Sequence, residues 1–265
     1  MRERLSLFVP SSRPYVLLVI FLACLDFFSV SLTVAQAQGT VSRGGFVYTG
    51  NTAAGSNNLI NGYVIDATTG TLTNASGTPF ATSVQILAFA AHPSGKFVYV
   101  ASGNGTLAAF TVDSFVGTLT PVSGSPYYTA QASVVSAGTI LAIDPAGKFL
   151  YLAGSNSLYA FTIDASSGAL SVVLGSPFSS SGASAVAIDP SGKYLIALSG
   201  SGTLASYAID GGTGALTAAG SVVSGCGGFF MAFEPSGHFL YAIENGGPQV
   251  FPPAVSTAAA VRSLP

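Results

Sequence analysis

The apolar residues of this chain fall into short runs that alternate with turn-forming residues. In "LAIDPAGKFLYLA", residues 141–153, two β-rich runs flank an Asp-Pro-Ala-Gly turn. Asp can bond its own backbone there, Pro presets φ, and Gly ends the turn without steric cost. Outside the N-terminal apolar segment, no window shows a convincing helical period. The pattern therefore predicts β-strands joined by tight hairpins.

Two turn motifs alternate along the chain, and each returns after roughly 45 to 52 residues. Four strands, named a to d in chain order, are predicted in each interval, with the first motif in the a–b hairpin and the second at the c–d turn. Such units in series are typical of a β-propeller, whereas a β-sandwich would not repeat its turn chemistry at this interval. The first motif is "HPSGK" from His92, "DPAGK" from Asp144, "DPSGK" from Asp189 and "EPSGH" from Glu234; the second is "YVIDATTGTLT" from Tyr63, "FTVDSFVGTLT" from Phe110, "FTIDASSGALS" from Phe161 and "YAIDGGTGALT" from Tyr207.

The expected fold is all-β, a propeller of four-stranded blades with about 4–5 blades represented. Complete blades are predicted at about 89–127, 141–178 and 186–223, with three strands before them. Two strands follow them, roughly Phe229–Phe233 and Phe239–Ile243. We therefore expect a propeller domain over residues 38–247.

After Glu244 the strand and turn pattern disappears. Pro252 and Pro253 cannot extend a central strand, and no second turn motif follows them. Residues 248–265 are therefore expected to be an unstructured or aberrant tail. An open ring leaves an apolar blade face exposed. The chain therefore either closes as an unusually small ring or, as we favour, is a shortened version of a longer propeller; pairing with another chain could also cover the open face.

The N-terminus carries the features of a secretory signal peptide. The apolar run Tyr15–Val34 follows three arginines and precedes the small-x-small pattern of Ala35–Ala37. We predict a signal peptide over residues 1–37, cleavage after Ala37, and a secreted or periplasmic protein that leaves the membrane on cleavage. The alternative is an uncleaved membrane anchor, since about 20 apolar residues could span a bilayer. Asp26 within the run favours cleavage.

Charge and cysteine content exclude several functions. Cleavage after Ala37 would leave five basic and eight acidic residues, a net charge of −3. That sign and sparseness exclude binding to the phosphate backbone of nucleic acids. The single remaining thiol, Cys226, cannot form an internal disulfide, and we interpret it as a small buried hydrophobic residue.

Few ionisable residues lie outside the repeated turns. Seven of the eight acids occupy turn positions, so only Glu244 stands apart. His92 replaces the acid of the a–b turn, and His238 replaces the lysine that follows that turn. These three are the candidate catalytic residues, although none can be assigned a role. Neither cofactor nor metal is expected, because the sequence offers no His-x-His, clustered carboxylates, Cys pair or phosphate loop ahead of a helix.

The opening "FVYTGN…GYVIDATTGTLT" and the repeated "DPSGK-aromatic-LYV…FTID…TGAL" resemble the lactonase-type, YVTN-like seven-bladed propellers. That family includes the bacterial propeller-type 6-phosphogluconolactonases, and the resemblance covers about residues 45–245. It implies a substrate at one mouth of the central channel, held by polar and cationic side chains. Relative to a seven-bladed ring the chain looks incomplete, with an apparent truncation at its C-terminus. No family catalytic residue can be carried over to a position of this sequence.

Two functions are therefore open. The first is a non-catalytic exported binding or scaffolding module for a sugar, a lactone or a protein ligand, because nearly all of the charge is explained by turns. The second is a lactone hydrolase of the 6-phosphogluconolactonase type, which the resemblance alone implies. Lactone hydrolysis requires an activated water and donors for the oxyanion. A phosphorylated substrate would also require clustered Arg or Lys, so the first hypothesis is favoured.

Overall fold

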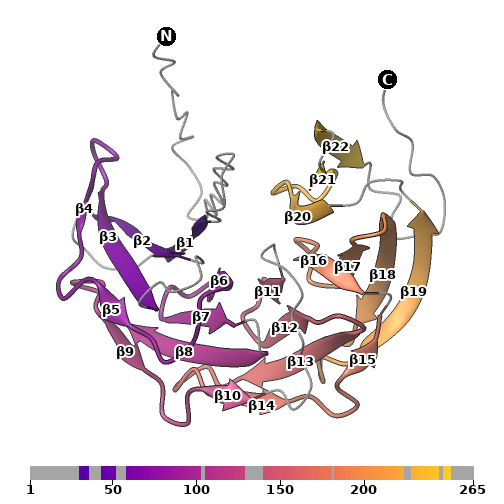
Figure 1. Cartoon of the computed structure of the whole chain (residues 1–265), viewed down its shortest axis with the longest axis horizontal. Helices are drawn as coiled ribbons and strands as arrows, with labels where there is room; N and C mark the ends of the chain where they lie inside the picture. Colours follow the sequence, from indigo (N-terminus) through magenta and orange to yellow (C-terminus); the bar gives the residue numbers. More distant parts are fainter. Residues whose placement is uncertain are drawn as a thin grey trace.

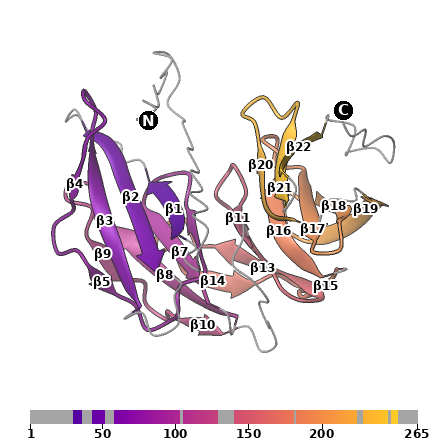
Figure 2. The same ribbon diagram turned by 45° about the horizontal axis from the view of Figure 1, so that its top comes forward.

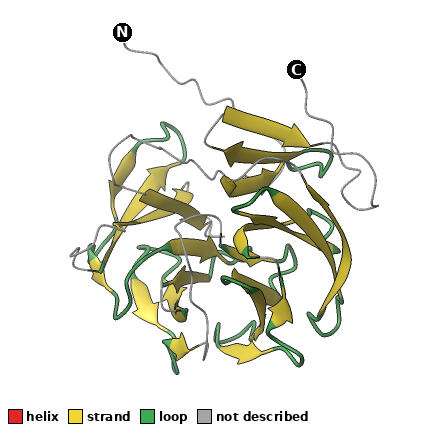
Figure 3. Cartoon of the chain, turned by 45° about the vertical axis from the view of Figure 1, so that its right-hand side comes forward, coloured by secondary structure: helices red, strands yellow, loops and turns green. Residues whose placement is uncertain are grey.

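The computed structural model is built from β-sheets. It describes residues 30–35, 43–51, 58–102, 105–128, 140–180, 182–223, 228–244 and 247–251. These residues form 22 strands in five antiparallel sheets and contain no helix (Figure 3), so none of the described part is a helix suited to crossing a bilayer. The all-β propeller prediction is confirmed.

Each sheet is one propeller blade, and the blades are numbered 1 to 5 in chain order. Blades 2 and 3 contain the predicted strands a, b and c, followed by a d segment split into two short strands that both pair with strand c. Their strands are β6 (Ala88–Ala91), β7 (Phe97–Ala101), β8 (Thr106–Val112), β9 (Leu119–Pro121) and β10 (Tyr127–Tyr128), then β11 (Leu141–Ile143), β12 (Phe149–Ala153), β13 (Ser157–Ile163), β14 (Leu170–Val172) and β15 (Phe178–Ser179).

Blade 1 follows the same plan, whereas the other two blades vary it. Blade 4 has an unbroken strand d, and the described residues of blade 5 form three strands. Blade 1 comprises β1 (Val30–Ala35), β2 (Arg43–Asn51), β3 (Leu59–Asp66), β4 (Leu72–Asn74) and β5 (Phe80–Ala81); blade 4 comprises β16 (Ala183–Ile188), β17 (Tyr194–Ser199), β18 (Thr203–Ile209) and β19 (Leu216–Val223); blade 5 comprises β20 (Gly228–Phe233), β21 (Leu240–Glu244) and β22 (Gly247–Phe251).

The blades stand side by side in an open arc. Figure 1 shows blade 1, in indigo, at one end and blade 5, in yellow, at the other, with an opening between them. In the tilted view of Figure 2, blade 5 stands above blade 4, apart from blade 1. The arrangement follows the repeat order along the chain, because each blade packs on its sequence neighbour.

One predicted boundary is wrong. The tail was expected to begin at residue 248, yet β22 extends to Phe251 and pairs with β21, with Tyr241 opposite Val250. Pro248 is tolerated because β22 is the edge strand among the described residues of its sheet, so no described strand requires its missing N–H. The propeller thus extends to residue 251, and residues 252–265 lie outside the described residues.

The first blade uses residues that the sequence assigns to the signal peptide. Strand β1 pairs with β2 over its full length, from Val30 opposite Asn51 to Ala35 opposite Phe46. Its sequence "VSLTVA" is rich in β-branched residues, which favour strands. Cleavage after Ala37 would remove this strand from blade 1. Residues 1–29 and 36–42 lie outside the described residues, so the signal peptide and its cleavage remain predictions.

The same type of junction joins each of three neighbouring pairs of blades. It forms between an aromatic pair on strand b and the c–d turn of the next blade. The tyrosine donates to the carbonyl of the turn glycine, and the ring of a phenylalanine two residues earlier lies against the same glycine. A Cβ on that glycine would lie 2.4 Å from the ring, and φ there is +73° to +76°, so only glycine fits. The bonds are Tyr48 Oη to Gly117 O (2.7 Å), Tyr99 Oη to Gly168 O (2.9 Å) and Tyr151 Oη to Gly214 O (3.0 Å), beside Phe46, Phe97 and Phe149.

Candidate functional site

The acids of the a–b turns bind the backbone of their own hairpins. Asp144 accepts from the backbone N–H of Phe149 (2.6 Å) and of Ala146 (3.1 Å). Asp189 accepts in the same way from Tyr194 N (2.7 Å), and Glu234 from His238 N (2.7 Å). These carboxylates are occupied in holding the turn, as the sequence predicted.

The aspartates that end strand c do the same for the c–d turns. Each accepts from the backbone N–H groups two and three residues later, at 2.7–3.0 Å. In Asp66 and Asp210 the backbone bonds hold the carboxyl pKa below its usual range. Bonds from the Ser166 hydroxyl and then from Ser167 depress the pKa of Asp164 further. Asp66, Asp164 and Asp210, with their pKa lowered in this way, stay ionised and are poor proton donors at neutral pH. The four aspartates that end strand c are Asp66, Asp113, Asp164 and Asp210.

His92 is a buried link between blades 2 and 3. Its Nε2 lies 2.8 Å from the Gly147 carbonyl oxygen on the next a–b turn, and its Nδ1 accepts from the backbone N–H of Ser94 at 3.1 Å. The bonds therefore fix the neutral tautomer with the proton on Nε2. Burial lowers the His92 pKa, which the bond to Gly147 opposes in part. Buried, and with both ring nitrogens in hydrogen bonds, the imidazole acts as a structural link between the two blades.

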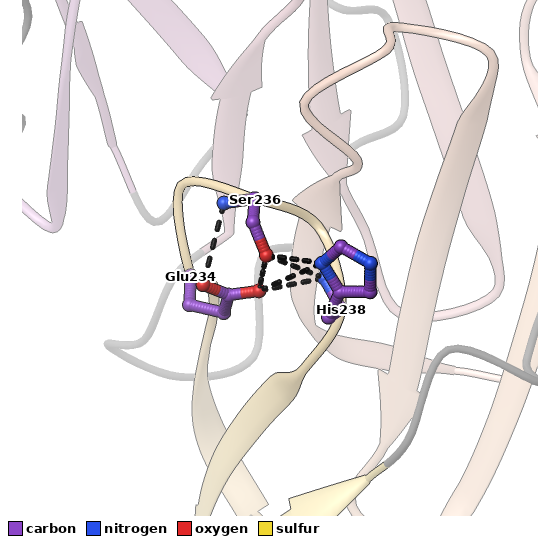
Figure 4. Close-up of polar contacts among 3 residues, drawn as sticks. All are labelled: Glu234, Ser236 and His238. Carbon is purple, nitrogen blue, oxygen red and sulfur yellow. Dashed lines mark hydrogen bonds and ion pairs between the residues drawn. The ribbon is translucent and has the colours of Figure 1, made fainter.

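His238 belongs to a small exposed cluster on the a–b turn of blade 5. Figure 4 shows Glu234, Ser236 and His238 within one turn, with the Ser236 hydroxyl in contact with both the Glu234 carboxylate and His238 Nδ1. His238 Nδ1 lies 3.8 Å from Glu234 Oε1. The Ser236 bonds lower the Glu234 pKa. The cluster contains the three side-chain types of a hydrolytic triad.

Its geometry is unsuited to nucleophilic catalysis. A triad requires the acid to bind the histidine nitrogen opposite the one that faces the serine, so that the histidine can take the serine proton. Here Glu234 and Ser236 both contact Nδ1, and the Ser236 hydroxyl donates directly to the carboxylate. The same Ser-to-acid contact occurs between Ser191 and Asp189. The cluster is therefore the ordinary a–b turn, with a histidine in the lysine position.

The third candidate, Glu244, ends strand β21 in the last blade. Its side chain lies outside the described residues, and it stays a prediction. His92 lies on blade 2, whereas His238 and Glu244 lie on blade 5. Cys226 also lies outside the described residues.

Neither metal ligands nor clustered cations form a site in the described part of the chain. No group of three or more His, Cys, Asp and Glu side chains there is placed to hold a metal ion. Lys96, Lys148 and Lys193 are all exposed and follow the a–b turns of three successive blades. Each belongs to a different blade, as expected from the repeat.

Sequence reasoning missed the groups that connect the blades. The bond from His92 to Gly147 joins residues 55 positions apart, and the tyrosine bonds join residues 63 to 69 positions apart. The Phe-x-Tyr spacing of strand b and the repeated turn glycine were visible signals, because both recur in register. The sequence alone did not show that they meet.

Comparison with known proteins identifies the repeat. Residues 89–233, more than half of the chain, match the family described as "Lactonase, 7-bladed beta-propeller". No curated protein matches the sequence.

Solved structures with this fold have varied descriptions. A periplasmic gluconolactonase of Pseudomonas aeruginosa has a TM-score of 0.66 at 14% identity, covering 90% of this chain and 78% of that one. A candidate 6-phosphogluconolactonase of Bacteroides uniformis gives 0.58 at 18% identity, with 85% and 77% covered. Chaetomium thermophilum Sqt1, bound to the N-terminus of ribosomal protein L10, gives 0.55 at 18% identity, with 85% and 60% covered.

At these sequence identities, the similarity to solved structures shows the fold alone. The match to the family model shows the family to which the chain belongs. Its matched residues include blades 2, 3 and 4 and the a–b and c–d turns of the repeat. The chain belongs to the lactonase family of seven-bladed β-propellers.

Proposed function

We propose that this chain is an exported lactonase-like propeller that binds a ligand without catalysing a reaction. One observation carries the proposal: apart from Glu244, the seven acids that follow Ala37 all accept backbone N–H groups of their own turns. A hydrolase requires a general base free to activate water and donors aimed at an oxyanion. Carboxylates fixed by two backbone amides are poorly placed for that task. Export rests on the predicted signal peptide.

A sugar, a lactone or a protein segment is the class of ligand that we propose. The family and the gluconolactonase of similar fold support a lactone or sugar. The Sqt1 complex with a ribosomal protein terminus supports a protein segment on the same architecture. The sparse negative charge argues against nucleic acid.

The second candidate function is hydrolysis of a sugar lactone. It is favoured by the similarity in fold to a periplasmic gluconolactonase, whose compartment matches the predicted export. In that case Glu244 would be the base, because it is the one acid outside the repeated turn positions. The lysines could neutralise a phosphate only if several reached one substrate.

Binding and turnover can be separated in one titration. The full chain is titrated with glucono-δ-lactone, and the melting temperature and the appearance of gluconate are followed together. A melting temperature that rises with lactone, while gluconate forms at the buffer rate, supports the binding function. Faster gluconate formation that is lost in Glu244→Gln and kept in Asp66→Asn supports the hydrolase instead. If the lactone changes neither quantity in a chain with β-sheet circular dichroism, a lactone ligand is excluded.

A further inference from the structure

The a–b and c–d turns of all blades lie on one side of the arc. Because neighbouring strands of a blade are antiparallel, these two turns meet at one end of the blade, and the b–c and d–a connections meet at the other. Successive a–b turns also contact each other: His92 bonds to the Gly147 carbonyl, and a Cβ on Gly237 would lie 3.2 Å from Pro190. The blades therefore share one orientation, and the arc has two different faces.

Nearly all of the charge lies on the face formed by these turns. We call it the charged face, and it comprises residues 43, 66–70, 92–96, 113–117, 144–148, 164–168, 189–193, 210–214 and 234–238. Between residues 43 and 251, every Asp, Lys, Arg and His is on this face. The exception among the glutamates is Glu244, which ends β21 at the b–c end of blade 5. The opposite face therefore has a different chemistry.

The opposite face, which we call the neutral face, consists of the b–c loops, the d–a connections and the adjoining strand ends. Hydroxyl and amide groups make up its polar content; Ser199 Oγ, for example, accepts from Thr203 N at 2.9 Å. The hydroxyl oxygen of Ser180 is buried and has no hydrogen-bond partner in the described part of the chain. Because buried polar groups normally have a partner, this hydroxyl is a group for a ligand to satisfy. The described residues of the neutral face are 58, 81–87, 102, 105–106, 128, 154–157, 179–180, 182 and 199–203, and they include no Asp, Glu, Lys, Arg or His.

Tyr128 is the one large apolar side chain exposed on the described part of the neutral face, and it is 77% exposed. It ends β10 opposite Thr106, the first residue of β8 after the b–c loop of blade 2. The same position holds Ala81 in blade 1 and Ser179 in blade 3. Because the repeat forms with small residues there, the fold does not require this ring, and its surface is available to a ligand.

We propose that the neutral face is the ligand-binding face and that its ligand is an uncharged carbohydrate, one ring of which stacks on Tyr128. The inference rests on the binding function proposed above and specifies its ligand. A sugar ring combines an apolar face of C–H groups, which packs on an aromatic ring, with hydroxyls at its edge, which pair with the hydroxyl and amide groups of the loops. An uncharged ligand requires no cation, and the described residues of the neutral face offer none.

Other ligands fit this face less well. A phosphorylated or carboxylated sugar is normally held by Arg or Lys, and Lys96, Lys148 and Lys193 all lie on the charged face. A protein segment usually buries several large anchor side chains in its contact, whereas Tyr128 stands alone on the described part of the neutral face. The observations therefore favour a carbohydrate over a peptide, and an uncharged carbohydrate over a phosphorylated one.

An oligosaccharide array tests the class of ligand. The full chain is applied to neutral hexose oligosaccharides and to phosphorylated and carboxylated oligosaccharides, at low salt and at about 0.5 M NaCl, where charge interactions are screened beyond about 5 Å. We expect retention on neutral oligosaccharides alone, with the same signal at both salt concentrations. Retention on the anionic oligosaccharides alone, or a signal that is lost at high salt, overturns the proposal.

Two exposed aromatic residues of blade 2 provide matched variants, because Tyr128 is on the neutral face and Phe115, which is 66% exposed, is on the charged face. The affinity for the retained oligosaccharide is measured by calorimetric titration. We expect Tyr128→Ala to weaken binding at least about 10-fold. Tyr128→Phe, which keeps the ring, should bind within about threefold of the unchanged chain. The control Phe115→Ala should leave the affinity unchanged, and circular dichroism confirms that each variant is folded.

The outcomes separate this inference from the binding function on which it rests. Oligosaccharide binding that Phe115→Ala weakens as much as Tyr128→Ala, or that neither variant weakens, overturns the assignment to the neutral face, while the binding function stands. Loss of binding in Tyr128→Phe overturns the stacking role of the ring. A folded chain that binds neither a neutral oligosaccharide nor glucono-δ-lactone overturns the inference together with the sugar-binding function.

Discussion

Substituting alanine for the turn glycine of blade 3 tests the junction between blades. In Gly168→Ala, the new Cβ would lie 2.4 Å from Cδ1 of Phe97, at a backbone φ of +75°. In the matched variant Gly70→Ala the φ is +70° and the Cβ meets nothing within 4 Å. The pair therefore has the same backbone strain and differs in the contact with the preceding blade.

The expected magnitudes follow from those two terms. A side chain in the left-handed region costs about 1–2 kcal/mol, and this cost is common to both variants. Forcing a methyl group into the packed ring of Phe97 adds about 1–3 kcal/mol. We expect Gly70→Ala to lower the free energy of unfolding by about 1–2 kcal/mol. Gly168→Ala should lower it by about 2–5 kcal/mol.

Urea unfolding measures this difference. The chain has no tryptophan and 11 tyrosines, so circular dichroism and tyrosine fluorescence are the signals to follow. The linear extrapolation gives the free energy for each variant. Equal losses in the two variants would refute the junction, because they would show that no ring lies against Gly168.

Three further predictions concern the hydrogen bonds. Tyr99→Phe should lower the free energy of unfolding by about 1–3 kcal/mol, because the Gly168 carbonyl loses its buried donor. The control Tyr241→Phe, on the exposed face of blade 5, should change this free energy by less than about 0.5 kcal/mol. Similar losses for the two variants in urea unfolding would contradict the junction. Since burial lowers the His92 pKa, the unfolded chain binds the proton more readily, and stability should fall as the pH drops below about 6.5 and level off below the folded pKa. His92→Gln should flatten that fall, and an unchanged pH profile would count against a buried neutral imidazole. Asp164 has a depressed pKa, so its contribution to the free energy of unfolding is present at neutral pH and is lost as the pH falls through its folded pKa. Asp164→Ala should therefore destabilise the chain more at pH 7 than at pH 2. An equal loss of stability at both pH values would contradict the hydrogen bonds of the carboxylate.

Local turn chemistry explains how much of the fold the sequence could predict. Asp-Pro-x-Gly determines a hairpin within a few residues, and the a–b turns at Asp144, Asp189 and Glu234 form as expected. Strand β22 was missed because the strand and turn pattern disappears after Glu244, where Pro252 and Pro253 and the missing second turn motif indicated a tail. Strand β1 was missed because its residues also continue an apolar, signal-like run.

The candidate site depended on contacts between blades that the sequence does not specify. His92 was correctly assigned to a turn position, but its bond to Gly147 requires the relative position of two blades. The role of His238 needed the orientation of Ser236, because the same three residue types could form a triad in another geometry. The relative position of residues on different blades is determined by packing between the blades rather than by local propensity.

The most direct test of the account is the rate of 6-phosphogluconolactone hydrolysis by the folded full chain, compared with buffer at the same pH. We expect the rate with the chain to equal the rate in buffer, a ratio of one, because the turn carboxylates accept hydrogen bonds from backbone amides. The same ratio is expected for Asp144→Asn and Asp189→Asn. A ratio well above one that falls to one in Glu244→Gln, in samples whose circular dichroism is unchanged, would contradict the account.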